Sequence, residues 1–376
     1  MKNTLTLIRQ HWLKAATLAL IAYALAFHVE YDELGRTFAS VSWRWVVLAI
    51  IANLASIMLK VASWKIIFDY TFKGIRGRWR DLTSALMIGF FVNLLIPARV
   101  GELARAFVIS RRQTLLGKPV SRSTVFGTIV LERVFDGIVF ALIVVYGVFR
   151  LDLPSWANTG AIILLVISGA LAAVLVTLEI KREKIKKTAE KAKAVHKEHH
   201  SRWRKMATRF YGVVARFSEG QKVLRSPVRI AAIFITTSAS WMSQLMAVFL
   251  SLHAFHLVGD MGSIGGADGF MNAGGIKGAL LLLILINVAG ALPATPGNVG
   301  VFQLATVIPL TVTYGISKTT ALAFSVGLQV IEGSIGLGVG GACLLREGLN
   351  FKQVRSGARE LEEEVEEEKE QGRDKP

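Results

Sequence analysis

Long apolar stretches, separated by short charged ones, recur along almost the whole chain. Six of these stretches are long enough to cross a membrane, because a hydrocarbon core of about 30 Å needs about 20 helical residues. They cover residues 12–28, 45–68, 123–149, 159–179, 228–257 and 319–345. The pattern therefore predicts an all-α fold, a polytopic membrane helix bundle with six full spans.

Two further apolar stretches, residues 83–96 and 278–292, are too short for a full crossing. The first reaches only about 21 Å at 1.5 Å per helical residue. Each is followed by a proline break, at Pro97 in the first case and at Pro293 and Pro296 in the second. We therefore expect two re-entrant hairpins, whose irregular backbone is tolerated at membrane depth only when it is buried in protein or lines a wet cavity.

The charges of the loops predict the side on which each loop lies. Bases dominate the segments 69–81, 108–122 and 180–227, which is the pattern of cytoplasmic loops. The segments 29–42 and 258–276 carry acids and few bases, so they are expected outside. This topology places both termini in the cytoplasm of a multi-pass protein of the cell membrane.

The two halves of the chain read alike and predict an inverted-topology repeat. Proline, valine and glycine coincide when 97–101 is laid under 296–300, and both halves read as span, span, hairpin, span. An odd number of crossings separates the halves, so the hairpins open to opposite faces. The predicted parts are a first transmembrane repeat at 1–158, a second at 159–345 that includes the basic loop 180–227, and a charged cytoplasmic tail at 346–376.

Composition agrees with a membrane protein. Hydrophobic residues make up 52% of the 376 positions, above the usual ~45–50% of soluble domains. The formal charge of +17 lies in the loops, so it does not indicate a nucleic-acid partner. Cys343 is the single cysteine, and the histidines of 180–227 lack partners at ligand spacing, so neither a metal nor a cofactor is expected. The run 12–28 precedes further spans and is expected to remain as a helix rather than be cleaved as a signal peptide.

Charged residues stand inside the predicted membrane region, where each costs about 2.5–3.5 kcal/mol on insertion scales unless it faces a cavity or an opposite charge. Helical spacing puts Glu102 and Arg105 on one face, and Glu132 and Asp136 on another. The candidate binding residues are Asn93, Arg99, Glu102, Arg105, Glu132, Arg133, Asp136, Asn298 and Gln303, with Pro97, Gly101, Pro293, Pro296, Gly297 and Gly300 as the structural breaks.

Two interpretations of these charges remain open. A buried ion-pair network would fix the first hairpin to its neighbour. Alternatively, an arginine in a polar cavity would meet an anionic headgroup, because the guanidinium fork suits phosphate and exposed helix N-termini add positive charge.

The runs NLLIPARVGELARAF, LERVFDGI and PATPGNVGVFQ resemble motifs of the flippase-like transmembrane family of lysylphosphatidylglycerol synthases, the multiple peptide resistance factors. The family's Pro-x-Arg-x-Gly-Glu-x-x-Arg motif is matched in full from Pro97 to Arg105, and its Glu-Arg-x-x-Asp motif from Glu132 to Asp136. In its Pro-Gly-Gly-x-Gly-x-x-Glu element, Asn298 replaces a glycine and Gln303 replaces the acid. The resemblance implies a membrane protein that moves or handles lipids. Lipid lysinylation by this chain alone is not expected, because no aminoacyl-transferring domain follows the membrane part.

The sequence thus predicts a lipid translocase-like protein, not an enzyme, that admits an anionic phospholipid or polyprenyl phosphate to a cavity between inverted repeats. No ATP-binding motif occurs, so movement would be passive, ion-coupled or driven by a separate energising or enzymatic partner. Three alternatives remain: a secondary transporter of a soluble anion, a membrane-embedded transferase with Glu102 or Asp136 as base, and a non-transporting partner subunit.

Overall fold

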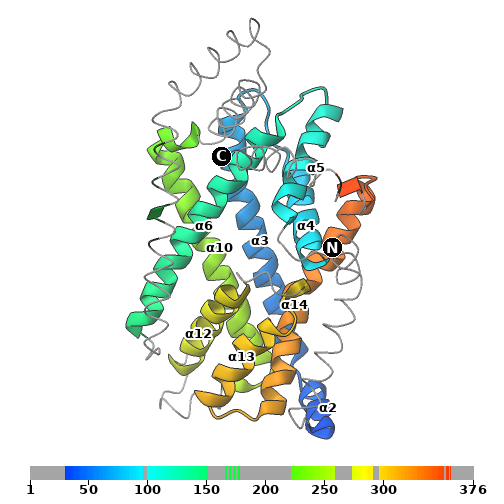
Figure 1. The fold of residues 1–376 in the computed structure, drawn as a ribbon. Helices are drawn as coiled ribbons and strands as arrows, with labels where there is room; N and C mark the ends of the chain where they lie inside the picture. The colour runs from blue at the N-terminus through cyan, green and yellow to red at the C-terminus, as the bar shows by residue number, and fades with distance from the viewer. Residues whose placement is uncertain are drawn as a thin grey trace, which may run out of the picture.

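The computed structural model describes residues 30–95, 100–150, 222–258, 273–290 and 296–350, with a few single positions between 166 and 177 and between 353 and 356. These parts are helical and contain no strand, which confirms the all-α prediction (Figure 1). The helices are α2 (Tyr31–Ala39), α3 (Trp43–Thr71), α4 (Trp79–Leu95), α5 (Gly101–Leu115), α6 (Arg122–Arg150), η1 (Lys222–Arg225), α10 (Pro227–Ala254), α12 (Ala273–Gly290), η2 (Pro296–Asn298), α13 (Val301–Val312) and α14 (Lys318–Arg346).

Within the described residues, α3, α10 and α14 are long and apolar enough to cross a membrane. Helix α6 is as long as α3, at 29 residues, but it carries Glu132, Arg133 and Asp136 in its interior. The predicted span 12–28 and nearly all of 159–179 lie outside the described residues, as do positions 180–221 of the basic loop. The helical architecture thus includes several helices that fit a membrane protein, and the count of six spans stays a prediction.

Helices α3 and α10 form the antiparallel centre of the molecule (Figure 1). The backbone N–H of Ser42, just before α3, donates to the carbonyl of Ala254 at the end of α10 over 2.9 Å. Midway along, the hydroxyls of Ser56 and Ser240 lie 3.0 Å apart. The hydroxyls of Ser63 and Thr237 form a second such pair, one to two helical turns away. Small hydroxyl residues at the contact let the two backbones approach closely.

The two broken helix pairs lie in opposite halves of the molecule. In Figure 1, α4 and α5 occupy the upper half and α12 and α13 the lower half. The open end of the first pair is joined by Arg112 and Asp81, whose Nε and Oδ1 atoms lie 3.4 Å apart. Helix α4 has 17 residues, and it is longer than the predicted stretch 83–96 because its polar first turn, with Asp81 near the helix N-terminus, is helical too.

The two breaks meet near the middle of the molecule. Gly297, in η2, has a φ of +57°, and a Cβ there would stand 3.1 Å from Leu94 Cδ1 at the end of α4. The carbonyl of Gly297 accepts a hydrogen bond from Gln329 Nε2 of α14 over 2.8 Å. The end of the first hairpin, the turn of the second and the middle of α14 therefore form one junction.

Helix α14 packs against α4 through glycine, and this contact gives a matched prediction. A Cβ on Gly340 would stand 2.5 Å from the carbonyl oxygen of Met87, whereas a Cβ on Gly338 would meet nothing within 4 Å. We expect Gly340→Ala to lower the free energy of unfolding by about 1–3 kcal/mol through overpacking. Gly338→Ala should be neutral or stabilising, because alanine favours helix. Thermal unfolding in detergent measures both, and equal melting temperatures would contradict the close packing.

Helix α2, which the sequence pattern did not predict, covers the start of α14. The carboxylate of Glu33 accepts hydrogen bonds from Ser317 Oγ (2.5 Å) and Thr320 Oγ1 (2.9 Å). These bonds favour the ionised form, so the pKa of Glu33 is lowered from its ordinary 4.5.

The lowered pKa predicts how the α2 contact depends on pH. A depressed carboxyl pKa gives stabilisation that is present above the ordinary value and is lost as the pH falls below it. Hydrogen exchange across 31–39, corrected for intrinsic rates, should therefore accelerate relative to α3 when the pH falls below 4.5. In Glu33→Gln the relative rate should not change with pH, and the same change in the variant would exclude Glu33 as its cause.

Candidate functional site

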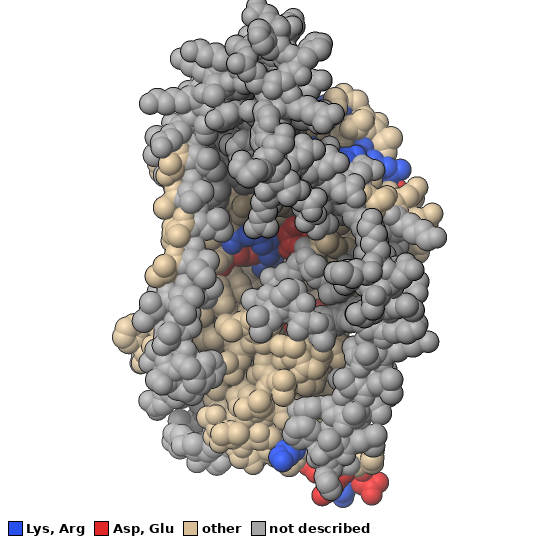
Figure 2. All heavy atoms as spheres, viewed as in Figure 1, with Lys and Arg blue, Asp and Glu red and all other residues tan. Residues whose placement is uncertain are grey.

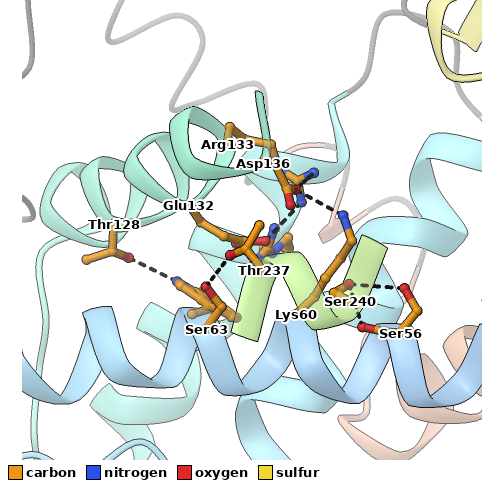
Figure 3. Close-up of polar contacts among 11 residues, drawn as sticks. Ser56, Lys60, Ser63, Thr128, Glu132, Arg133, Asp136, Thr237 and Ser240 are labelled. Atoms are coloured by element: carbon orange, nitrogen blue, oxygen red, sulfur yellow. Dashed lines mark hydrogen bonds and ion pairs between the residues drawn. The ribbon is translucent and has the colours of Figure 1, made fainter. Parts of the chain in front are cut away.

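Helix α6 positions the acidic residues of the candidate site. Glu132 and Asp136 are four residues apart and lie on one helix face, with 2% and 8% of their surface exposed. That face is turned toward α3 and α10 (Figure 3). Both carboxylates therefore lie inside the helix bundle, where they need partners.

The first partner is Arg105 of α5, which is 2% exposed. Its Nη2 atom lies 2.5 Å from Oε2 of Glu132, and its guanidinium carbon lies 4.2 Å from the ring centre of Trp64 on α3. Trp64 Nε1 donates in turn to Thr128 Oγ1 of α6 over 3.0 Å. This sealed arrangement joins α3, α5 and α6 and agrees with the ion-pair interpretation for Arg105.

The second acid, Asp136, binds two cations. Its Oδ2 atom lies 3.0 Å from Lys60 Nζ of α3 and 3.0 Å from Arg133 Nη1 (Figure 3). Arg133 also approaches Glu132, with 3.2 Å between Nη2 and Oε1. We call the five connected residues the charge chain; it holds three cations and two carboxylates and runs through Lys60, Asp136, Arg133, Glu132 and Arg105.

Exposure distinguishes the cations of the charge chain. The side chain of Arg133 is 34% exposed, against 13% for Lys60 and 2% for Arg105. Figure 2 shows basic and acidic side chains gathered together on one face, midway along the molecule. Arg133 is therefore the member of the chain best placed to meet a molecule from outside.

Two residues near the first break have different surroundings. Oε2 of Glu102 is buried without a hydrogen-bond partner, and Glu102 forms no described ion pair. Asn93 Oδ1 accepts the backbone N–H of Gly101 over 2.7 Å, which closes the start of α5 against α4. Pro97 and Arg99 lie outside the described residues, as does Pro293 of the second break.

The second break is held by neutral hydrogen bonds. Gln303 accepts the N–H of Gly300 over 2.6 Å and donates to Gln329 Oε1 over 2.7 Å. Asn298 has a φ of +56° and forms part of the turn. Gln303 and Asn93 thus use their described hydrogen bonds to hold the breaks, and their part in substrate binding stays a prediction.

Lys60 is the residue that the sequence reasoning missed. It stands within the apolar run 45–68, and its partner is 76 positions away. The sequence does contain a signal that could have identified Lys60. A charged lysine deep in a predicted span is costly, so it needs an opposite charge or a cavity. No group of three or more metal-ligating side chains occurs in the part of the chain that the structure describes.

The chain was compared with family models, with the curated proteins and with the solved structures. A search of the curated proteins and a search of the solved structures found no match. The family model described as the lysylphosphatidylglycerol synthase TM region matches residues 12–340, which is most of the chain. The chain therefore belongs to the lysylphosphatidylglycerol synthase transmembrane-region family.

Proposed function

We propose that this protein is a lipid translocase-like protein that admits a phosphate-bearing lipid headgroup to a site at Arg133. The observation that carries the proposal is the side chain of Arg133, which is 34% exposed and belongs to a chain of three cations and two carboxylates. A guanidinium fork binds phosphate through paired N–H donors. The proposal involves no chemical reaction on the lipid.

The contrast with Arg105 supports this choice of arginine. A purely structural cation inside a bundle is best sealed against one carboxylate, as Arg105 is against Glu132. Arg133 shares both of its carboxylates with other cations, so it is not needed to neutralise either of them. An incoming anion would balance the extra positive charge of the charge chain, and the nearby Glu102 would limit how strongly it is held.

Helix pairing supports the inverted repeat that the proposal requires. The first residues of α3 and α10 are 184 positions apart, and the contacting residues Ser56 and Ser240 have the same separation. Helices α6 and α14, which end the two proposed repeats, both have 29 residues. Equivalent helices that cross at equivalent residues are expected around a pseudo-two-fold axis in the membrane plane, with the binding site near the midplane.

The repeat predicts that the loop after α5 and the turn after α13 lie on opposite sides of the membrane. Single cysteines at Lys118 and at Tyr314 in a Cys343→Ser background should react with an impermeant thiol reagent from different sides, Tyr314 from outside. Labelling of both from the same side would contradict the repeat.

The direct test is movement of fluorescent phosphatidylglycerol and of zwitterionic phosphatidylcholine in proteoliposomes that contain the full chain. We expect faster exchange of the anionic lipid across the bilayer, and preferential retention of that lipid in native mass spectrometry. Uptake of soluble phosphate without lipid movement would favour the secondary transporter instead. Equal exchange and equal retention of the two lipids would contradict an anionic-headgroup site.

A further inference from the structure

A further acidic residue of the membrane region, apart from the charge chain and Glu102, is Glu332 of α14. Helix α14 is apolar between Lys318 and Arg346, and Glu332 is the one charged residue between these ends. It stands fourteen residues from each end, or about 21 Å at 1.5 Å per residue. Its side chain is half-buried.

The register of α14 places Glu332 at the junction of the two breaks. A Cβ on Gly340 would contact Met87, and one on Gly336 would stand 3.6 Å from Cβ of Phe90, so α14 runs antiparallel to α4. One turn further along the same face, Glu332 lies level with the end of α4 near Leu94. Gly297 packs on Leu94 and accepts the hydrogen bond of Gln329, one turn before Glu332.

Within the described residues, the carboxyl group of Glu332 has neither a hydrogen bond nor an ion pair, in contrast to the acids of the charge chain. The neighbouring η2 and α13 contain no titratable side chain. Lys60, the cation nearest the middle of α3, is bonded to Asp136.

The other helices packed against α14 also carry titratable residues. These are Arg44, Lys60, Lys65, Asp69 and Tyr70 on α3, Arg80 and Asp81 on α4, Arg229 and His253 on α10, and Tyr31, Asp32, Glu33 and Arg36 on α2. Helix α14 itself adds Lys318, Cys343 and Arg346.

An unpaired carboxyl group at this depth has two forms of very different cost. The ionised form is expensive in a low-dielectric interior without a cation, whereas the neutral acid is tolerated. Where water reaches the carboxyl group, the ionised form is solvated and the proton can leave. A carboxyl group placed where both hairpins meet can therefore exchange its proton with whichever side is open.

We propose that Glu332 is a proton-binding site at the junction of the two breaks, and that its protonation couples lipid translocation to proton movement across the membrane. The coupling rests on the proposed translocase function, whereas the proton site can be tested without it. The carboxylate oxygen of Glu332 takes a proton from hydronium on one side, whose O–H bond breaks as the Glu332 O–H bond forms. On the other side the Glu332 O–H bond breaks and the proton passes to a water molecule. A proton carried with an anionic headgroup leaves the loaded protein without added net charge.

The proton site is tested by infrared spectroscopy of the full chain in nanodiscs as a function of pH. The wild-type protein should show the carbonyl band of a neutral carboxylic acid at a pH where ordinary carboxyl groups are ionised, and Glu332→Gln should remove it. Glu33→Gln is the matched control, because it removes a carboxylate from outside the junction, and it should retain the band. A spectrum of Glu332→Gln identical to that of the wild type would overturn the proton site.

Coupling is tested by imposing a pH gradient on proteoliposomes with fluorescent phosphatidylglycerol. If one proton moves with each lipid, a gradient of one pH unit shifts the distribution of labelled lipid between leaflets by up to about tenfold. Glu332→Gln should lose this shift, while Glu332→Asp and Glu33→Gln should keep it. Lipid movement in the wild type without any response to the gradient would overturn the coupling alone. Absence of all lipid movement would overturn the translocase function and the coupling together, and the infrared result would still decide the proton site.

Discussion

Replacing Glu132 by glutamine should collapse the yield of folded protein. The substitution leaves Arg105 buried at 2% exposure without its carboxylate, and Arg105 already has two nitrogen atoms, Nε and Nη1, without a hydrogen-bond partner. Breaking a buried ion pair from one side costs about 3–5 kcal/mol, a large part of the 5–15 kcal/mol by which proteins are usually stable. Size-exclusion chromatography in detergent and thermal unfolding measure the loss.

Two companion variants separate the lost pair from other effects. Arg105→Met combined with Glu132→Leu removes both charges and should recover most of the folded yield, because an apolar replacement of a buried pair is often neutral or stabilising. Arg44→Gln removes an exposed charge from α3 and should change the melting temperature little. A Glu132→Gln protein as stable as the Arg44→Gln control would show that the pair does not hold α5 to α6.

The sequence predicted the helices more completely than the contacts between them. Apolar run length located α3, α6, α10 and α14 to within a few residues, because a membrane span must be continuous. Helix α2 was missed, since it is short and is held by bonds to Ser317 and Thr320 far along the chain. Apolar pattern does not encode such a contact.

The candidate site was predicted in part for the same reason. The spacing of Glu132 and Asp136 fixed their common helix face, which requires only local geometry. The partner of Asp136 on α3, Lys60, depends on how two distant helices pack, and a single sequence does not carry that information. Sequence also left open which arginine is sealed and which is more exposed, because exposure is set by the neighbouring helices.

We propose that the two interpretations of the charged residues apply to different arginines. Arg105 meets the description of a structural ion pair, since it is sealed between Glu132 and the ring of Trp64. Arg133 is the more exposed of the two, at 34% side-chain exposure, and is the arginine that we propose to meet the headgroup. Substitutions at these two positions should therefore have different consequences, one for folding and the other for lipid recognition.

Arg133→Gln should fold normally and lose the preference for anionic lipid. Asp136 would retain Lys60 and Glu132 would retain Arg105, so neither carboxylate is left without a cation. A lost hydrogen bond to a charged phosphate is worth about 1.5–3 kcal/mol, or roughly 10- to 150-fold in affinity.

Competition between phosphatidylglycerol and phosphatidylcholine in native mass spectrometry, with the proteoliposome assay beside it, measures the effect of Arg133→Gln. Arg133→Lys keeps the charge without the planar fork and should fall between the wild type and Arg133→Gln. Lys277→Gln removes an exposed positive charge on α12, away from the charge chain, and should retain the preference. If Arg133→Gln still selects phosphatidylglycerol, the headgroup is bound elsewhere. If it loses folded yield as Glu132→Gln does, Arg133 is a structural member of the ion-pair network, because only a cation required for packing would give the same collapse.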